Sequence, residues 1–150
     1  MRIFLFAAFA IAIIGLILCV PKPTGPAKTN IFVGKMNEGK LSATFMAPGP
    51  SWFSGIGVTG DSFDALEASS FSVRIVFPDG RVASVKDRKP ISSNWFRKRP
   101  SFRISLLDGG QGGPKMFGED SVYRVEIQTS GYKGQQISVW ARFVDDRLFK

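Results

Sequence analysis

The chain has 150 residues, and its 20 Lys and Arg residues against 12 Asp and Glu residues give a net charge of +8, which favours anionic partners. This length supports one domain with a proper core and leaves little room for two. The chain contains no histidine and a single cysteine. Ser-His-Asp and Cys-His catalytic arrangements and the usual zinc sites are therefore excluded, and we expect neither a cofactor nor a metal centre.

The first twenty residues predict that the chain is inserted into a membrane or exported across it. Residues 3–20, which begin with Ile3 and end with Val20, contain no charged side chain. As a helix rising about 1.5 Å per residue they would reach roughly 27 Å, close to a hydrocarbon thickness of about 30 Å. We interpret them as a signal anchor that holds an exported body at the cell membrane as a single-pass protein. The alternatives are a cleaved signal peptide, with the body periplasmic or secreted, and lipidation of Cys19.

A short linker follows the apolar segment. Residues 21–29 contain three prolines and a glycine, so they cannot continue a helix. We expect three parts in the chain: a signal anchor or signal peptide over residues 1–20, a Pro-rich linker over residues 21–29, and a β-sandwich domain over residues 30–150.

From residue 30 onward the hydrophobic pattern has the period of two that is typical of strands. The predicted strands cover residues 31–35, 40–46, 71–77, 82–86, 102–107, 121–129 and 136–144. The glycine-interrupted stretch over residues 51–59 predicts a loop and then a short or bulged strand. A brief helix is expected after Asp61, which we assign as its N-cap.

This pattern predicts an all-β fold, a single antiparallel β-sandwich of seven to eight strands with one short helix, behind the N-terminal apolar helix. A small barrel is the alternative. The hairpin over residues 71–86, which turns at residues 78–80, is its clearest element. The last two strands alternate so that Tyr123 and Val125 on one, and Val139 and Phe143 on the other, point into a common core.

Residues 86–103 carry seven basic side chains against one acid, Asp87. Aromatic side chains among basic ones are typical of a contact with an anionic surface. The first candidate binding residues lie here: Trp95, Phe96, Arg97, Lys98 and Arg99. The partners left open are an anionic membrane or glycan surface and an acidic protein, whereas export argues against nucleic acid. The bland interpretation, that Ile91, Trp95 and Phe96 fill the core while a solvated loop carries the charges, is favoured over any single partner.

A glycine-rich loop over residues 109–118 supplies the second candidate contact. A plain hairpin connection is the favoured interpretation, and the alternative is a recognition loop with Met116 and Phe117 exposed at its tip. A phosphate loop is not expected, because such a loop leads into a helix and this one leads into a strand.

The function that these features predict is a membrane-anchored or exported β-sandwich interaction module of the cell envelope, without a catalytic motif. The layout resembles that of many small bacterial envelope proteins, in architecture rather than in any motif. One alternative is a hydrolase of an envelope polymer that uses two carboxylates. Its candidate residues are Asp61, Asp64, Glu119 and Asp120. A second alternative is an immunity-type inhibitor that blocks the acidic cleft of a toxin.

Overall fold

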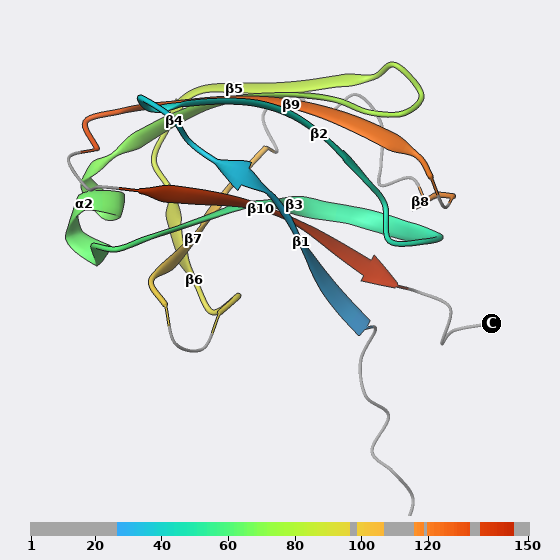
Figure 1. Ribbon diagram of the computed structural model, residues 1–150, viewed down its shortest axis with the longest axis horizontal. Helices are drawn as coiled ribbons and strands as arrows, with labels where there is room; N and C mark the ends of the chain where they lie inside the picture. The colour runs from blue at the N-terminus through green and yellow to red at the C-terminus, as the bar shows by residue number, and fades with distance from the viewer. Residues whose placement is uncertain (1–26, 97–98, 107–115, 119, 133–135, 146–150) are drawn as a thin grey trace, which may run out of the picture.

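The computed structural model describes residues 27–96, 99–106, 116–118, 120–132 and 136–145, and this part of the chain is almost entirely β-structure (Figure 1). The predicted membrane segment over residues 3–20 lies outside the described residues. Within the described ranges, no helix is long and apolar enough to cross a membrane.

The strands form two antiparallel sheets that lie one above the other in Figure 1. The six-stranded sheet contains, in spatial order, β1 (Ala27–Lys35), β10 (Ile137–Asp145), β3 (Ser51–Gly60), β7 (Ser101–Ile104) and β6 (Ile91–Ser93), with β8 (Met116–Phe117) paired to β3. The four-stranded sheet contains β2 (Lys40–Met46), β9 (Val122–Ser130), β4 (Ser70–Val76) and β5 (Val82–Arg88). The all-β fold of two antiparallel sheets is confirmed, and its layers are arranged like a sandwich.

The core lies between the two sheets and is rich in aromatic rings. Tyr123 of β9, Phe143 of β10, Phe45 of β2 and Phe53 of β3 form ring contacts with centroid distances of 5.2 to 6.2 Å. The common core predicted for the last two strands is therefore confirmed. The two strands nevertheless belong to opposite sheets, because β10 pairs with β1 and β3 while β9 pairs with β2 and β4.

Strand β3 is longer than the sequence pattern predicts. It runs for ten residues through the large sheet, pairs with β10, β7 and β8, and contains a register shift near Gly55. The expectation of a loop at the start of this stretch is wrong, whereas the expected bulge in the strand is present. Strand β1 likewise begins at Ala27, inside the stretch assigned to the linker, because Ala27 continues the pairing as far as Asp145.

The single described helix, α2 (Phe63–Ala68), begins one residue later than expected. Its N-cap is Ser62, whose hydroxyl oxygen accepts a hydrogen bond of 3.3 Å from the Ala65 N–H. The prediction of Asp61 for this role is wrong, because its carboxylate instead accepts a hydrogen bond from the Tyr132 hydroxyl. Asp61 therefore ties the start of the helix to the segment between β9 and β10.

The hairpin of β4 and β5 is confirmed, with Ile75 opposite Ala83. Its turn is closed by two backbone bonds of 2.8 and 2.9 Å between Phe77 and residues 80–81, and Gly80 has the positive φ of 84° that the turn requires. The described residues contain ten strands rather than seven or eight. The additional β6 and β8 have three and two residues, too few to show an alternating pattern.

Candidate contact surface

The outer side of the six-stranded sheet, which faces away from the core, gathers aromatic and basic side chains. Residues opposite one another in an antiparallel pair share a side of the sheet, so Arg142 shares its outward side with Asn30, and Trp140 shares its outward side with Phe32 and Gly57. We call this surface the aromatic-basic face. Its residues are Lys28, Phe32, Lys35, Trp52, Trp95, Phe96, Arg103, Trp140 and Arg142.

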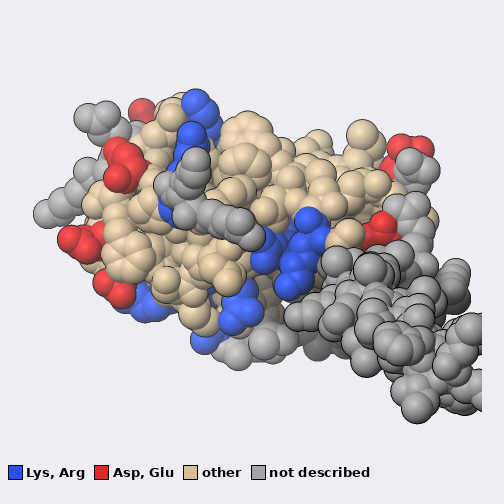
Figure 2. All heavy atoms as spheres, turned by 90° about the horizontal axis from the view of Figure 1, so that it is seen from below, with Lys and Arg blue, Asp and Glu red and all other residues tan. Residues whose placement is uncertain are grey.

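The charged residues at the outward strand positions of this sheet are all basic. Figure 2 views the molecule from the side of the six-stranded sheet and shows Lys and Arg side chains along its middle, with Asp and Glu toward its two ends. The outward positions of β1, β10, β3, β7 and β6 hold no acidic residue. The exposed Lys28, Lys35 and Arg103 form no ion pair with described residues.

Trp95 lies in the connection between β6 and β7 and packs on the backbone of β3. A Cβ atom added at Gly57 would come within 2.6 Å of two carbons of the indole ring. The ring can occupy this position only because Gly57 has no side chain. The glycines that interrupt the sequence pattern of β3 therefore leave space for an aromatic ring to pack against the strand.

Arg142 of β10 also contacts Trp95. Its guanidinium carbon lies 4.1 Å from the centroid of the Trp95 ring, and its Nη2 donates a hydrogen bond of 3.5 Å to the Trp95 carbonyl oxygen. Its Nε donates a 2.8 Å hydrogen bond to Asn30 Oδ1. Burial lowers the pKa of Arg142 from its usual value. An arginine stays protonated in proteins, so the guanidinium makes a cation–π contact that is worth about 1 to 2 kcal/mol.

A row of three aromatic rings crosses the face beside Trp95. The Trp140 ring lies 4.8 Å from Phe96 and 5.1 Å from Phe32, measured between ring centroids, and its Nε1 donates a 3.1 Å hydrogen bond to Thr59. Phe32 is 49% exposed at the edge of the sheet. The row therefore joins the edge strand β1 to the connection that carries Trp95.

The structure brings Trp95 and Phe96 together as the sequence analysis grouped them, but neither fills the core. Both are half-buried against the outside of the sheet, and Arg99 is exposed. Arg97 and Lys98 lie outside the described residues.

The second candidate contact separates into two different environments. Met116 is exposed and pairs with Trp52, so it shares the outward side of the sheet. Phe117 is 8% exposed and packs 5.7 Å from the Tyr123 ring. The expectation that Phe117 is exposed at a loop tip is therefore wrong. Successive residues of β8 point to opposite sides, so one of the two must enter the core.

The residues of this face that come from β1, β10 and β7 are not among those that the sequence pattern singles out. Trp140 and Arg142 occupy the outward positions of a strand whose inward positions were identified correctly. Bulky outward residues on a half-buried strand are the signal that could have found them. The sequence alone does not show that Phe32 and Asn30 lie opposite them, because these residues are more than one hundred positions away along the chain.

A polar hollow adjoins the face at the β6 edge. It measures about 490 Å³ and is lined by Ser92, Ser93, Asn94, Trp95 and Arg103. It contains no carboxylate, so it offers hydroxyl, amide and guanidinium groups beside an aromatic ring. These groups suit a polar or anionic ligand better than a catalytic reaction.

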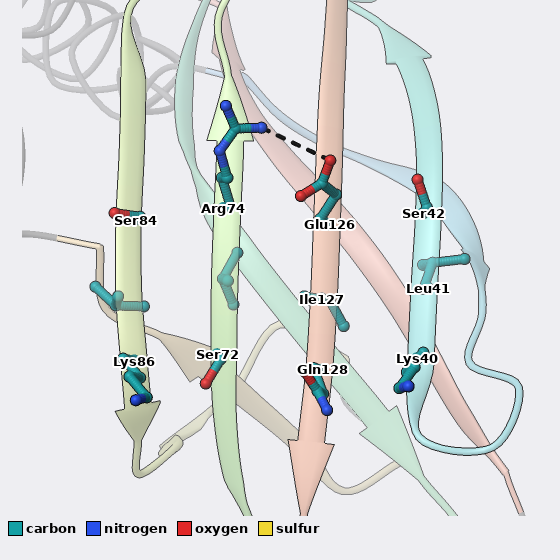
Figure 3. A pocket seen from close by; sticks show the side chains of 12 residues that line it. Lys40, Leu41, Ser42, Ser72, Arg74, Ser84, Lys86, Glu126, Ile127 and Gln128 are labelled. Atoms are coloured by element: carbon teal, nitrogen blue, oxygen red, sulfur yellow. Dashed lines mark ion pairs between the residues drawn. The ribbon is translucent and has the colours of Figure 1, made fainter.

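The outer side of the four-stranded sheet carries a different surface. It holds a shallow trough of about 560 Å³. Arg74 and Glu126 form an ion pair of 3.6 Å across it, and Figure 3 shows this pair between Ser84 and Ser42, with Lys86 and Lys40 farther along the outer two strands. Both partners of this pair are exposed, so it adds little to stability. The outward positions of β2, β9, β4 and β5 include four basic residues, Lys40, Arg74, Lys86 and Arg124, but they carry no aromatic residue.

Two of the candidate carboxylates, Asp61 and Asp64, have structural roles. Asp61 is engaged by Tyr132, and Asp64 lies in the first turn of α2, where its charge stabilises the helix. No group of three or more Asp, Glu, His or Cys residues within the described ranges is placed to hold a metal ion. Glu119 lies outside these ranges, and the trough of the four-stranded sheet holds a single carboxylate.

The chain matches no protein-family model, no curated protein and no solved structure.

Proposed function

We propose that the protein is an interaction module of the cell envelope, anchored by residues 3–20, and that the aromatic-basic face is its contact surface. One observation carries this proposal. All three tryptophans of the chain, Trp52, Trp95 and Trp140, belong to the same side of one sheet, together with basic residues and no acidic one. Tryptophan and arginine are the residues most enriched where binding energy concentrates at interfaces.

Partial exposure of the rings supports a binding role over a purely structural one. Phe32 exposes half of its surface, and Trp52, Trp95 and Trp140 are only half-buried. The core between the sheets is complete without them. Covering these rings with a partner would remove further apolar surface from water, at about 25 cal/mol per Å².

The hydrolase alternative finds no support in the described carboxylates. Glycoside hydrolysis needs two carboxyl groups about 5 to 10 Å apart in one cleft. The polar hollow holds none, and the trough of the four-stranded sheet holds only Glu126. The inhibitor alternative would use the same aromatic-basic face and differs only in its partner.

Photo-cross-linking tests the proposal in the native envelope. A photoreactive phenylalanine replaces Phe32 in the full chain, and a matched variant carries it at Ser84, an exposed position on the opposite sheet. We expect cross-links to an envelope component from position 32 and few from position 84. Fractionation of the same cells is expected to place the full-length chain with the membranes.

Equal cross-linking from both positions, or none from position 32, would contradict the proposed contact surface. A chain that is recovered soluble, with its first twenty residues removed, would contradict the anchor and leave the exported form.

A further inference from the structure

We propose that the aromatic-basic face docks on the anionic phospholipid surface of the membrane that holds the chain. This inference rests on the proposed function, because it takes residues 3–20 as inserted in that membrane. It adds the chemical identity of the partner, which is the lipid headgroup layer itself.

The composition of the face matches the chemistry of a membrane interface. Tryptophan is enriched at the headgroup level, because its ring is apolar while its N–H can bond to water or lipid. Lysine and arginine beside such rings are attracted to anionic headgroups. Lys28, Lys35 and Arg103 are exposed and unpaired within the described part of the chain, so their charges are available for lipid phosphates.

The length of the tether favours this partner over a distant one. Only residues 21–26 separate the predicted anchor from β1, and six residues span at most about 20 Å. Strand β1 is the edge strand of the six-stranded sheet and carries Lys28 and Phe32 on its outward side. The chain therefore enters the body through the strand that contributes Lys28 and Phe32 to the aromatic-basic face.

Charge alone would not choose between the two sides of the molecule, because the four-stranded sheet also presents basic residues. The aromatic rings make the difference. They occur on the six-stranded side, and the outward positions of β2, β9, β4 and β5 have none. Docking through the tryptophans can therefore be distinguished from general attraction to an anionic surface.

The tryptophans themselves provide the measurement. The full chain is reconstituted into nanodiscs whose lipids carry brominated acyl chains, which quench a nearby indole. The chain has three tryptophans, and none lies in residues 1–26, so the emission reports the aromatic-basic face alone. We expect quenching in nanodiscs rich in phosphatidylglycerol and little in phosphatidylcholine alone. Raising the salt from about 0.1 to 1 M, which shortens the Debye length from about 10 to 3 Å, is expected to relieve it.

Matched variants test which charges act. Lys28→Ser, Lys35→Ser and Arg103→Ser are each expected to lower the ratio of docked to undocked chains by about fivefold, the loss expected for one cation near an anionic surface. Lys40→Ser and Lys86→Ser, on the opposite side, are the controls and are expected to leave the ratio unchanged. Unaltered emission of each variant in phosphatidylcholine would show that its fold is intact.

Quenching that is absent in phosphatidylglycerol, or equal in both lipids, would overturn the inference. A fall in the ratio of docked to undocked chains that Lys40→Ser and Lys86→Ser share with the variants of the face would also overturn it. If quenching is absent but position 32 still cross-links to an envelope protein, the lipid inference fails and the proposed function stands. If quenching and cross-linking from position 32 are both absent, the lipid inference and the proposed function both fail.

Discussion

Gly57 determines where the connection between β6 and β7 can lie. Gly57 has no side chain on the outward side of β3, and the Trp95 ring packs directly against the backbone there. Trp95 in turn presents its face to the guanidinium group of Arg142. The absence of one side chain thus positions a cation–π pair, which helps to build the candidate contact surface.

Gly57→Ala is expected to displace the Trp95 ring, because the new methyl carbon would lie 2.6 Å from two ring carbons. We expect the free energy of unfolding to fall by about 1 kcal/mol, as is usual for overpacking, together with a red shift of tryptophan emission. Chemical denaturation and fluorescence measure the two effects. Gly118→Ala is the control, since a Cβ there meets nothing within 4 Å.

A double-mutant cycle identifies the cause of that loss. In the Trp95→Ala background, Gly57→Ala should cost much less, because the clashing ring is gone. An equal cost in both backgrounds would mean that the backbone of β3, and not the indole, is sensitive to the change.

At the scale of elements, helix α2 shows how a local signal can be displaced by one residue. Asp61 and Ser62 are both good N-cap residues by type. Tyr132, which is distant in the sequence, engages Asp61, and Ser62 adopts the extended backbone of a cap, with φ −128° and ψ 123°. A tertiary contact therefore decides which of two adjacent residues caps the helix.

Ser62→Ala is expected to lower the free energy of unfolding by about 1 kcal/mol, because the Ala65 N–H loses its partner. Ser62→Asp keeps an acceptor at the cap and is expected to retain most of the stability. Thermal unfolding of the two variants side by side is the measurement. If both substitutions cost the same, the hydroxyl oxygen of Ser62 is not what stabilises the helix.

At the scale of the whole molecule, the two sheets meet around Tyr123. Its ring contacts phenylalanines from both sheets, and its buried hydroxyl has no hydrogen-bond partner among the described protein atoms. Burial is the main cause that raises the pKa of Tyr123 to about 12, with a smaller contribution from Asp79. The folded state therefore favours the neutral phenol more strongly than the unfolded chain does.

This difference predicts that stability falls as the pH rises from 10 toward 12. In that range the folded protein keeps the Tyr123 proton while the unfolded chain, with a pKa near 10, releases it. Two pH units correspond to about 2.7 kcal/mol as an upper limit. Tyr123→Phe is expected to be nearly neutral at pH 7, since no hydrogen bond is lost, and to reduce the fall in stability above pH 10.

Denaturation curves at pH 7 and pH 11 measure both effects. Tyr132→Phe is the contrasting variant, because Tyr132 donates a hydrogen bond to Asp61 and its removal is expected to cost about 1 kcal/mol at pH 7. A large loss for Tyr123→Phe at pH 7 would show that its hydroxyl has a partner in solution.

The order of residues along the chain is enough to predict the features that depend on near neighbours. Alternation is a property of one strand, so the inward side chains of β4 and β10 and the turn at Gly80 follow from local pattern. Trp95 and Phe96 are adjacent in the chain, and both lie against the outer side of the six-stranded sheet. The absence of histidine limits the chemistry of the protein whatever its fold.

Features that depend on pairing between distant segments follow from the tertiary fold alone. The register of β1 with β10 places Phe32 beside Trp140, and the pairing of β8 with β3 turns Phe117 inward and Met116 outward. The two sides of a strand differ in their side chains. The backbone N–H and C=O groups that pair a strand with its neighbour, however, are the same at every residue. The assignment of neighbours therefore comes from how the whole set of side chains packs, which no local period contains.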